Sequence, residues 1–281
     1  MRKSRWSQLG VGVVLAAHAV ALAHSAWRFA PTANEPTRLA AGLAIWYRRQ
    51  FSLDIDNPPL IKILGAWPAA MADAEPRVSH IGFMAPYHFL FLNGPRAFTY
   101  IFWGRLACIP FSLLGAWICY RWAGELYGTA AGLGAMVLWC TCPYMLGHGC
   151  LVVADVPAAA LLAAAWRSYH AALGDGGMGR WLAASLWLGT ALVVKFTALL
   201  LLPLYVLVWL WSMRRGVGRA GPSGEAMHDE RGAEAASHGA AGEGGATSAR
   251  PASPAVRGLR RRRLAGCGAM ALLGSVALLF I

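Results

Sequence analysis

Long apolar runs recur along this 281-residue chain, and they constrain its fold more than any other feature. Hydrophobic residues make up 57% of the chain and charged residues only 14%, whereas an average soluble domain has about 25% charged residues. Apolar runs of about 18 or more residues are typical of membrane spans. The runs cover residues 9–27, 99–120, 129–146, 151–169, 181–213 and 264–281. They predict an all-α, polytopic integral membrane protein with about seven transmembrane helices.

The net charge of +12 would suggest nucleic-acid binding in a soluble protein. In a membrane protein, an excess of Lys and Arg instead marks the loops that face the cytoplasm. The first run follows three basic residues, Arg2, Lys3 and Arg5. This start also fits a cleavable signal peptide, but we favour an uncleaved first span. We expect a multi-pass protein of the bacterial inner (plasma) membrane, with a cytoplasmic N-terminus and an outer loop over residues 28–96.

The run over residues 181–213 is too long for one span of about 20 residues, and it contains Lys195 near its middle. A lysine at the bilayer centre costs about 2.5–3.5 kcal/mol on insertion scales. Basic residues flank the run at both ends, and the positive-inside rule places both ends in the cytoplasm. We therefore predict two short helices, over residues 181–194 and 197–211, with Lys195 at the outer turn between them.

Residues 213–263 are rich in Gly, Ala, Ser and Arg and hold few large apolar residues. Such a composition cannot bury a core, so it predicts a disordered, basic cytoplasmic linker. The linker separates a helical membrane domain, residues 1–212, from a last transmembrane helix, residues 264–281. Because the chain ends inside that apolar run, we expect a truncated chain whose last helix continues beyond Ile281.

The outer loop contains two candidate amphipathic helices, over residues 35–49 and 58–71, in which apolar residues repeat at helical spacing. Asn34 and Asn57 precede these helices and are expected to cap them. With tryptophans on both, we expect the helices to lie in the plane of the membrane interface. A polar turn over residues 54–59 separates them at the outer surface.

Five short motifs follow one another at or near the predicted outer face. They are Asn34-Glu35-Pro36-Thr37-Arg38-Leu39-Ala40-Ala41-Gly42, Asn57-Pro58-Pro59-Leu60, Gly104-Arg105-Leu106, Ala154-Asp155-Val156-Pro157 and Val194-Lys195-Phe196-Thr197. Their order, spacing and outward placement resemble the C-type (GT-C) fold of membrane glycosyltransferases, in particular the protein O-mannosyltransferase and aminoarabinose transferase group. The resemblance covers residues 9–212. It implies an enzyme that transfers a sugar from a polyprenyl-phosphate carrier to an acceptor at the outer face of the membrane.

The sequence departs from this family at two positions. The first loop of the family carries an Asp-Glu pair whose Asp is the main candidate for activating the acceptor hydroxyl, and Asn34 stands at the Asp position here. Asn57 stands where the aminoarabinose transferases have a Lys that meets the lipid phosphate. Since Asn cannot act as a general base, three alternatives are open. Another carboxylate takes this role, the mechanism differs, or the chain is a non-catalytic scaffold or transporter-like protein.

The expected catalytic residues are carboxylates that the topology places at the outer face, where they could accept the proton of the acceptor hydroxyl. They are Glu35, Asp56 and Asp155. Each also has a structural interpretation, as a carboxylate in the first turn of a helix or in a polar turn. For Asp54 we favour the polar turn.

The expected substrate-binding residues border the same carboxylates. They are Asn34, Arg38, Asn57, Arg105 and Lys195. Lys195 could bind the donor phosphate as a point charge, with Arg105 in a similar role. The alternative for Lys195 is a lysine that only reaches the headgroups at the end of a helix.

We expect no cofactor and no metal site, although a divalent metal is compatible with the residues present. The spacing Cys140-Thr-Cys142 is shorter than the Cys-x2–4-Cys spacing of structural zinc sites. The expected partners are a polyprenyl-phosphate sugar donor, a lipid, glycan or protein acceptor, and membrane lipids, but no nucleic acid.

Overall fold

The computed structural model describes residues 5–74, 84–175 and 177–216, and the regular elements within these ranges are all helical. The elements are α1 (Arg5–Arg28), α2 (Asn34–Arg48), α3 (Leu60–Met71), α4 (Ala85–Asn93), α5 (Arg96–Tyr127), α6 (Thr129–Thr141), α7 (Pro143–His148), α8 (Asp155–Asp175), α9 (Met178–Leu192), the 3-10 helix η2 (Phe196–Leu200) and α10 (Leu201–Gly216). The predicted all-α class is confirmed for this part of the chain. Most of the predicted linker, and the whole predicted last helix, lie outside the described residues.

Three helices of the described chain are long and apolar enough to cross a membrane. They are Ser7–Arg28, Arg96–Tyr127 and Phe196–Arg214. The predicted number of about seven transmembrane helices is not confirmed, because α6 and α9 have only 13 and 15 residues. Both helices nevertheless overlap apolar runs that the sequence identifies, at 129–146 and 181–213.

The apolar run over residues 129–146 does not form one helix. α6 ends at Thr141, Cys142 is extended with a ψ of 124°, and α7 begins at Pro143. A residue that precedes proline is disfavoured in the helical conformation, which accounts for the break. The next helix, α8, begins at Asp155 rather than at residue 151, so residues 149–154 form a non-helical link between α7 and α8.

The predicted break at Lys195 is confirmed. α9 ends at Leu192, Lys195 is extended with φ −151° and ψ 133°, and η2 and α10 follow it. The lysine thus lies in a turn between two helical segments and not inside one long helix.

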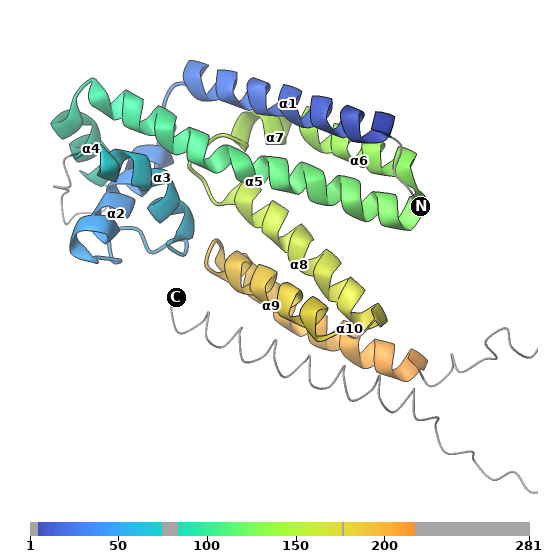
Figure 1. Ribbon diagram of the computed structural model, residues 1–281. Helices are drawn as coiled ribbons and strands as arrows, with labels where there is room; N and C mark the ends of the chain where they lie inside the picture. The colour runs from blue at the N-terminus through green and yellow to red at the C-terminus, as the bar shows by residue number, and fades with distance from the viewer. Residues whose placement is uncertain (1–4, 75–83, 176, 217–281) are drawn as a thin grey trace, which may run out of the picture.

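α5, with 32 residues, is the longest helix in the described part of the chain, and it packs against α1, α3, α6 and α8. Figure 1 shows α2, α3 and α4 gathered at the N-terminal end of α5, away from the turn that joins α5 to α6. α4 is a third helix between α1 and α5, in the predicted outer loop, and the sequence pattern does not predict it. The candidate site lies at this end of α5.

α2 and α3 correspond to the two predicted amphipathic helices, and Leu39 and Leu43 of α2 lie in the core that they share. The predicted caps are wrong. Ala33 and Pro59 stand at the N-cap positions, and neither helix has a side-chain cap hydrogen bond. Both Asn side chains are therefore available for other contacts.

Close approach of α2 to α3 requires a glycine at position 42. An ideal Cβ built on Gly42 would lie 2.2 Å from the carbonyl oxygen of Lys62 and 2.5 Å from the Cβ of Ala66. Gly42 therefore fixes the distance between the two helices that carry the first two motifs.

Candidate functional site

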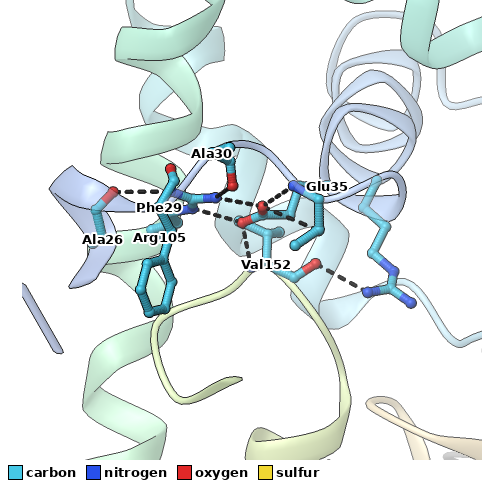
Figure 2. Close-up of polar contacts among 8 residues, drawn as sticks. Ala26, Phe29, Ala30, Glu35, Arg105 and Val152 are labelled. Carbon is cyan, nitrogen blue, oxygen red and sulfur yellow. Dashed lines mark hydrogen bonds and ion pairs between the residues drawn. The ribbon is translucent and has the colours of Figure 1, made fainter. Parts of the chain in front are cut away.

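The Glu35 carboxylate and the Arg105 guanidinium form a bidentate ion pair between α2 and α5 (Figure 2). Arg105 Nε donates to Glu35 Oε1 at 2.8 Å, and Nη2 donates to Oε2 at 2.7 Å. Glu35 is 0% exposed and Arg105 is 1% exposed. The structure thus brings together two predicted site residues, but it encloses both of them.

The remaining N–H groups of Arg105 hold the C-terminal end of α1. Nη1 donates to the carbonyl oxygens of Ala26 and Phe29 at 2.9 and 2.7 Å, and Nη2 donates to that of Ala30 at 2.9 Å (Figure 2). The last carbonyl groups of a helix lack partners within the helix, so a cationic side chain is favourable there. With five N–H groups and five hydrogen bonds, Arg105 has no donor left for a phosphate.

Glu35 accepts three further hydrogen bonds. The backbone N–H of Thr32 donates at 2.9 Å, its hydroxyl at 3.1 Å, and the N–H of Val152 at 3.2 Å. Burial alone would raise the pKa of the Glu35 carboxyl, but the hydrogen bonds and charge of Arg105 and the two backbone donors outweigh it, so the pKa lies below its ordinary value. The contact with Thr32 is local, because Thr32 lies three positions before Glu35 and directly before Ala33, the N-cap residue of α2.

The link between α7 and α8 is tied to α2 at Val152. The N–H of Val152 donates to Glu35, and its carbonyl oxygen accepts a hydrogen bond from Arg38 Nη1 at 3.2 Å. Arg38 is partly buried. Because Asp155 begins α8 only three residues later, these two bonds fix the start of α8 relative to α2.

Asp155 and Lys195 form an ion pair across the site, between the start of α8 and the turn before η2. Their side chains are 39% and 30% exposed, respectively. Both residues were predicted from the sequence, and the structure places their charges in direct contact. Unlike Glu35 and Arg105, this pair is accessible to a ligand.

The Asn-Pro-Pro-Leu motif meets the Lys195 turn. The N–H of Leu60 donates to the carbonyl oxygen of Val193 at 3.2 Å. In the preceding loop, Asp56 is exposed and Asn57 is partly buried, with its carbonyl oxygen bound by Lys62. Asn34 is exposed at the start of α2. Lys62 is a residue that the sequence analysis did not single out.

The five motifs therefore form one ring of contacts. α2 binds the link before Asp155, Asp155 pairs with Lys195, the Lys195 turn binds Leu60, and α3 packs against α2 at Gly42. Gly104 completes the ring, since an ideal Cβ there would lie 2.7 Å from the carbonyl oxygen of Gly65 in α3. Segments more than 100 residues apart in the chain thus meet, and the partly exposed Asp155–Lys195 ion pair is one of the contacts of the ring.

No group of three or more His, Cys, Asp and Glu side chains that could hold a metal ion occurs among the described residues. Cys140, Cys142 and Cys150 are free thiols. The charged side chains that the ring brings together are carboxylates and cationic groups.

Residues 96–223 match the family model described as dolichyl-phosphate-mannose-protein mannosyltransferase. This match supports the family resemblance inferred from the five motifs, three of which lie within it. No curated protein and no solved structure matches the chain.

Proposed function

We propose that this chain is a membrane glycosyltransferase of the dolichyl-phosphate-mannose-protein mannosyltransferase-like family, and that it transfers a sugar from a polyprenyl-phosphate carrier to an acceptor at the outer face of the membrane. The family match supports glycosyl transfer in general. The observation that carries the proposal for this chain is the partly exposed Asp155–Lys195 pair, whose two residues belong to two of the five family-like motifs.

In the proposed reaction, the hydroxyl oxygen of the acceptor forms a bond to the anomeric carbon of the sugar. The bond between that carbon and the phosphate oxygen breaks, and its electron pair stays on the phosphate. Lys195 stabilises the negative charge of the departing phosphate. Asp155 accepts the proton of the acceptor hydroxyl, with the exposed Asp56 as the second accessible carboxylate.

Because Asp155 and Lys195 are in contact, the donor must bind before Asp155 can act as a base. A donor phosphate competes with the Asp155 carboxylate for the Lys195 ammonium, because both anions are attracted to the same charge. Binding of the donor then frees Asp155 to act as a base. Within the ion pair, the two charges compensate each other.

We assign Glu35 and Arg105 a structural role instead of the catalytic and phosphate-binding roles expected from the sequence. Neither side chain is exposed, and Arg105 uses all its N–H groups within the chain. Arg38, Asn34 and Asn57 border the ring and remain proposed contacts of the substrates.

A comparison of two variants tests this assignment. Lys195→Ala should weaken binding of the donor about tenfold or more, since hydrogen bonds to charged groups contribute about 1.5–3 kcal/mol. Asp155→Asn should retain donor binding but lower kcat about 100-fold or more, as expected for loss of a general base. Donor binding and sugar transfer are measured separately, in the purified chain reconstituted in vesicles.

Glu125→Gln is a matched control, because Glu125 forms a partly exposed ion pair with Arg167 of α8 outside the ring. It should leave both quantities unchanged. Full transfer activity in both Lys195→Ala and Asp155→Asn would contradict the assignment of the site.

The alternative function is a non-catalytic protein that only binds the lipid carrier. The neutral Asn34 and the fully bonded Glu35 favour it, because the Asp-Glu pair of the family then offers no accessible carboxylate. Under this alternative, the wild-type chain binds the donor without turnover, and Asn34→Asp restores transfer. Turnover by the wild-type chain excludes it.

A further inference from the structure

Lys62 of α3 has a buried ammonium group that the proposed reaction does not use. The residue is 3% exposed. Its Nζ donates to the carbonyl oxygens of Asp54 and, at 2.6 Å, of Asn57, and it lies 3.3 Å from Asp54 Oδ2. The ammonium has three N–H donors, so these three oxygens use all of them.

These contacts fold the loop between α2 and α3 around one charge. Residues 50–59 form no helix, and two of their carbonyl groups, three residues apart, converge on Lys62. The N–H of Asp56 donates to Asp54 Oδ1 at 3.3 Å. Asp56 is exposed, whereas the ammonium group that two carbonyl groups of the same loop bind is buried.

Lys62 is itself held in place from two sides. Gly42 of α2 lies directly over the Lys62 carbonyl group, where any side chain would collide. Two residues before Lys62, the N–H of Leu60 binds the carbonyl oxygen of Val193, which precedes the Lys195 turn. The loop around Lys62 is thus tied to the same turn that carries the proposed phosphate-binding residue.

A purely space-filling role would not need this charge. Burying an ammonium and a carboxylate is costly, and apolar side chains of similar volume often serve stability as well or better. Burial lowers the pKa of the Lys62 ammonium, although the charge and hydrogen bond of Asp54 act against this. What the ammonium supplies, and a methionine would not, is a fixed loop conformation.

We propose that Lys62 is a positioning residue, whose ammonium holds Asp56 and Asn57 at the edge of the Asp155–Lys195 site, where they contact the acceptor. This inference rests on the proposed function, because it assigns the loop to the same site. It goes beyond it by naming the residue that sets the loop conformation, through contacts with the backbone of the loop.

Labelling of a buried cysteine tests the conformation of the loop without any need for transfer. Leu53, in the same loop, is 8% exposed, so a Leu53→Cys thiol should react slowly with a maleimide. In the full chain, reconstituted in vesicles, Lys62→Met should raise its labelling rate about tenfold or more, because the loop opens locally. Tyr47→Phe is the matched control, since it removes a hydrogen bond of 2.8 Å to the Ala70 carbonyl group of α3 without touching the loop. It should leave the rate unchanged.

Kinetics then test the link to the site. Lys62→Met should raise the KM for the acceptor about tenfold or more, with the affinity for the donor unchanged. If the single variant fails to fold, Lys62→Met combined with Asp54→Asn replaces it, because the pair then leaves no unpaired buried carboxylate.

An unchanged labelling rate in the lysine variants would overturn the proposal, whatever the activity. So would faster labelling with unchanged acceptor kinetics, because the loop would then lie outside the site. An absence of transfer by the wild-type chain contradicts the proposed function, while the labelling still reports whether Lys62 holds the loop.

Discussion

At the residue scale, burial distinguishes the two ion pairs formed by the predicted site residues, because Glu35–Arg105 is buried and Asp155–Lys195 is partly exposed. The sequence predicts Glu35 and Arg105 as site residues from their motifs, and both do lie in the ring. Their pairing joins residues 70 positions apart, so it depends on tertiary packing that local patterns do not contain. The contact of Thr32 with Glu35, in contrast, is local, since the two residues are three positions apart.

Removing either partner of the Glu35–Arg105 pair should destabilise the fold strongly. Glu35→Ala leaves a buried guanidinium without its carboxylate, and loss of one partner of a buried pair typically costs about 3–5 kcal/mol. Thermal unfolding in detergent should show a markedly lower Tm. As a control, Glu125→Gln, in a half-exposed pair, should change Tm little. Equal shifts in the two variants would contradict the structural role of Glu35.

The pH dependence of stability follows from the lowered pKa of Glu35. Its folded pKa lies below the ordinary value of 4.5, so the folded state favours the ionised carboxylate. This contribution is fully present above the ordinary pKa and is lost as the pH falls through the folded value. The Tm of the wild type should therefore fall between about pH 5 and pH 3, and more steeply than that of Glu35→Gln. Parallel curves for the two chains would refute this origin of the acid sensitivity.

At the element scale, the helical spacing of apolar residues predicts α2 and α3, and Lys195 predicts the break between α9 and η2. Each difference between the predicted and the observed helices has a physical reason. Pro143 divides the run at 129–146, because the residue before a proline is disfavoured in the helical conformation. α4 was missed because the run Phe89–Leu92 is apolar without a helical period, so it gives no amphipathic signal. The contact between α2 and α3 depends on the absence of a side chain at Gly42.

Gly42→Ala should separate α2 from α3. Its Cβ would lie 2.2 Å from the Lys62 carbonyl oxygen, so the helices must move, at a cost of about 1–3 kcal/mol. The expected result is a lower Tm and a faster reaction of the Leu53→Cys thiol. Gly12→Ala in α1, where nothing lies within 4 Å of the new Cβ, should keep or slightly raise Tm. An unchanged Tm for Gly42→Ala would show that the two helices are not in close contact.

At the scale of the whole molecule, the order of the motifs and their placement on one face follow from the sequence alone. The closed ring of contacts does not, because the contacts of Glu35 with Val152 and of Leu60 with Val193 join segments more than 100 residues apart. The apolar helices and the family match identify a membrane protein. The orientation predicted from the basic loops remains a prediction, with the ring on the outer side and the end of α5 in the cytoplasm.

Cysteine labelling in intact cells checks this orientation. Ile55 and Tyr127 are both exposed, the first in the loop that borders the ring and the second at the far end of α5. In a chain without native cysteines, a membrane-impermeant maleimide should label Ile55→Cys directly. Tyr127→Cys should be labelled only after the membrane is permeabilised. The reverse pattern would place the ring in the cytoplasm.

The most direct measurement is the release of free polyprenyl phosphate from a sugar-charged polyprenyl-phosphate donor by the wild-type chain in vesicles. We predict release that depends on an added acceptor and is about 100-fold slower in Asp155→Asn. No release by a chain that unfolds cooperatively and binds the donor, or equal release by both chains, would contradict sugar transfer at the Asp155–Lys195 site.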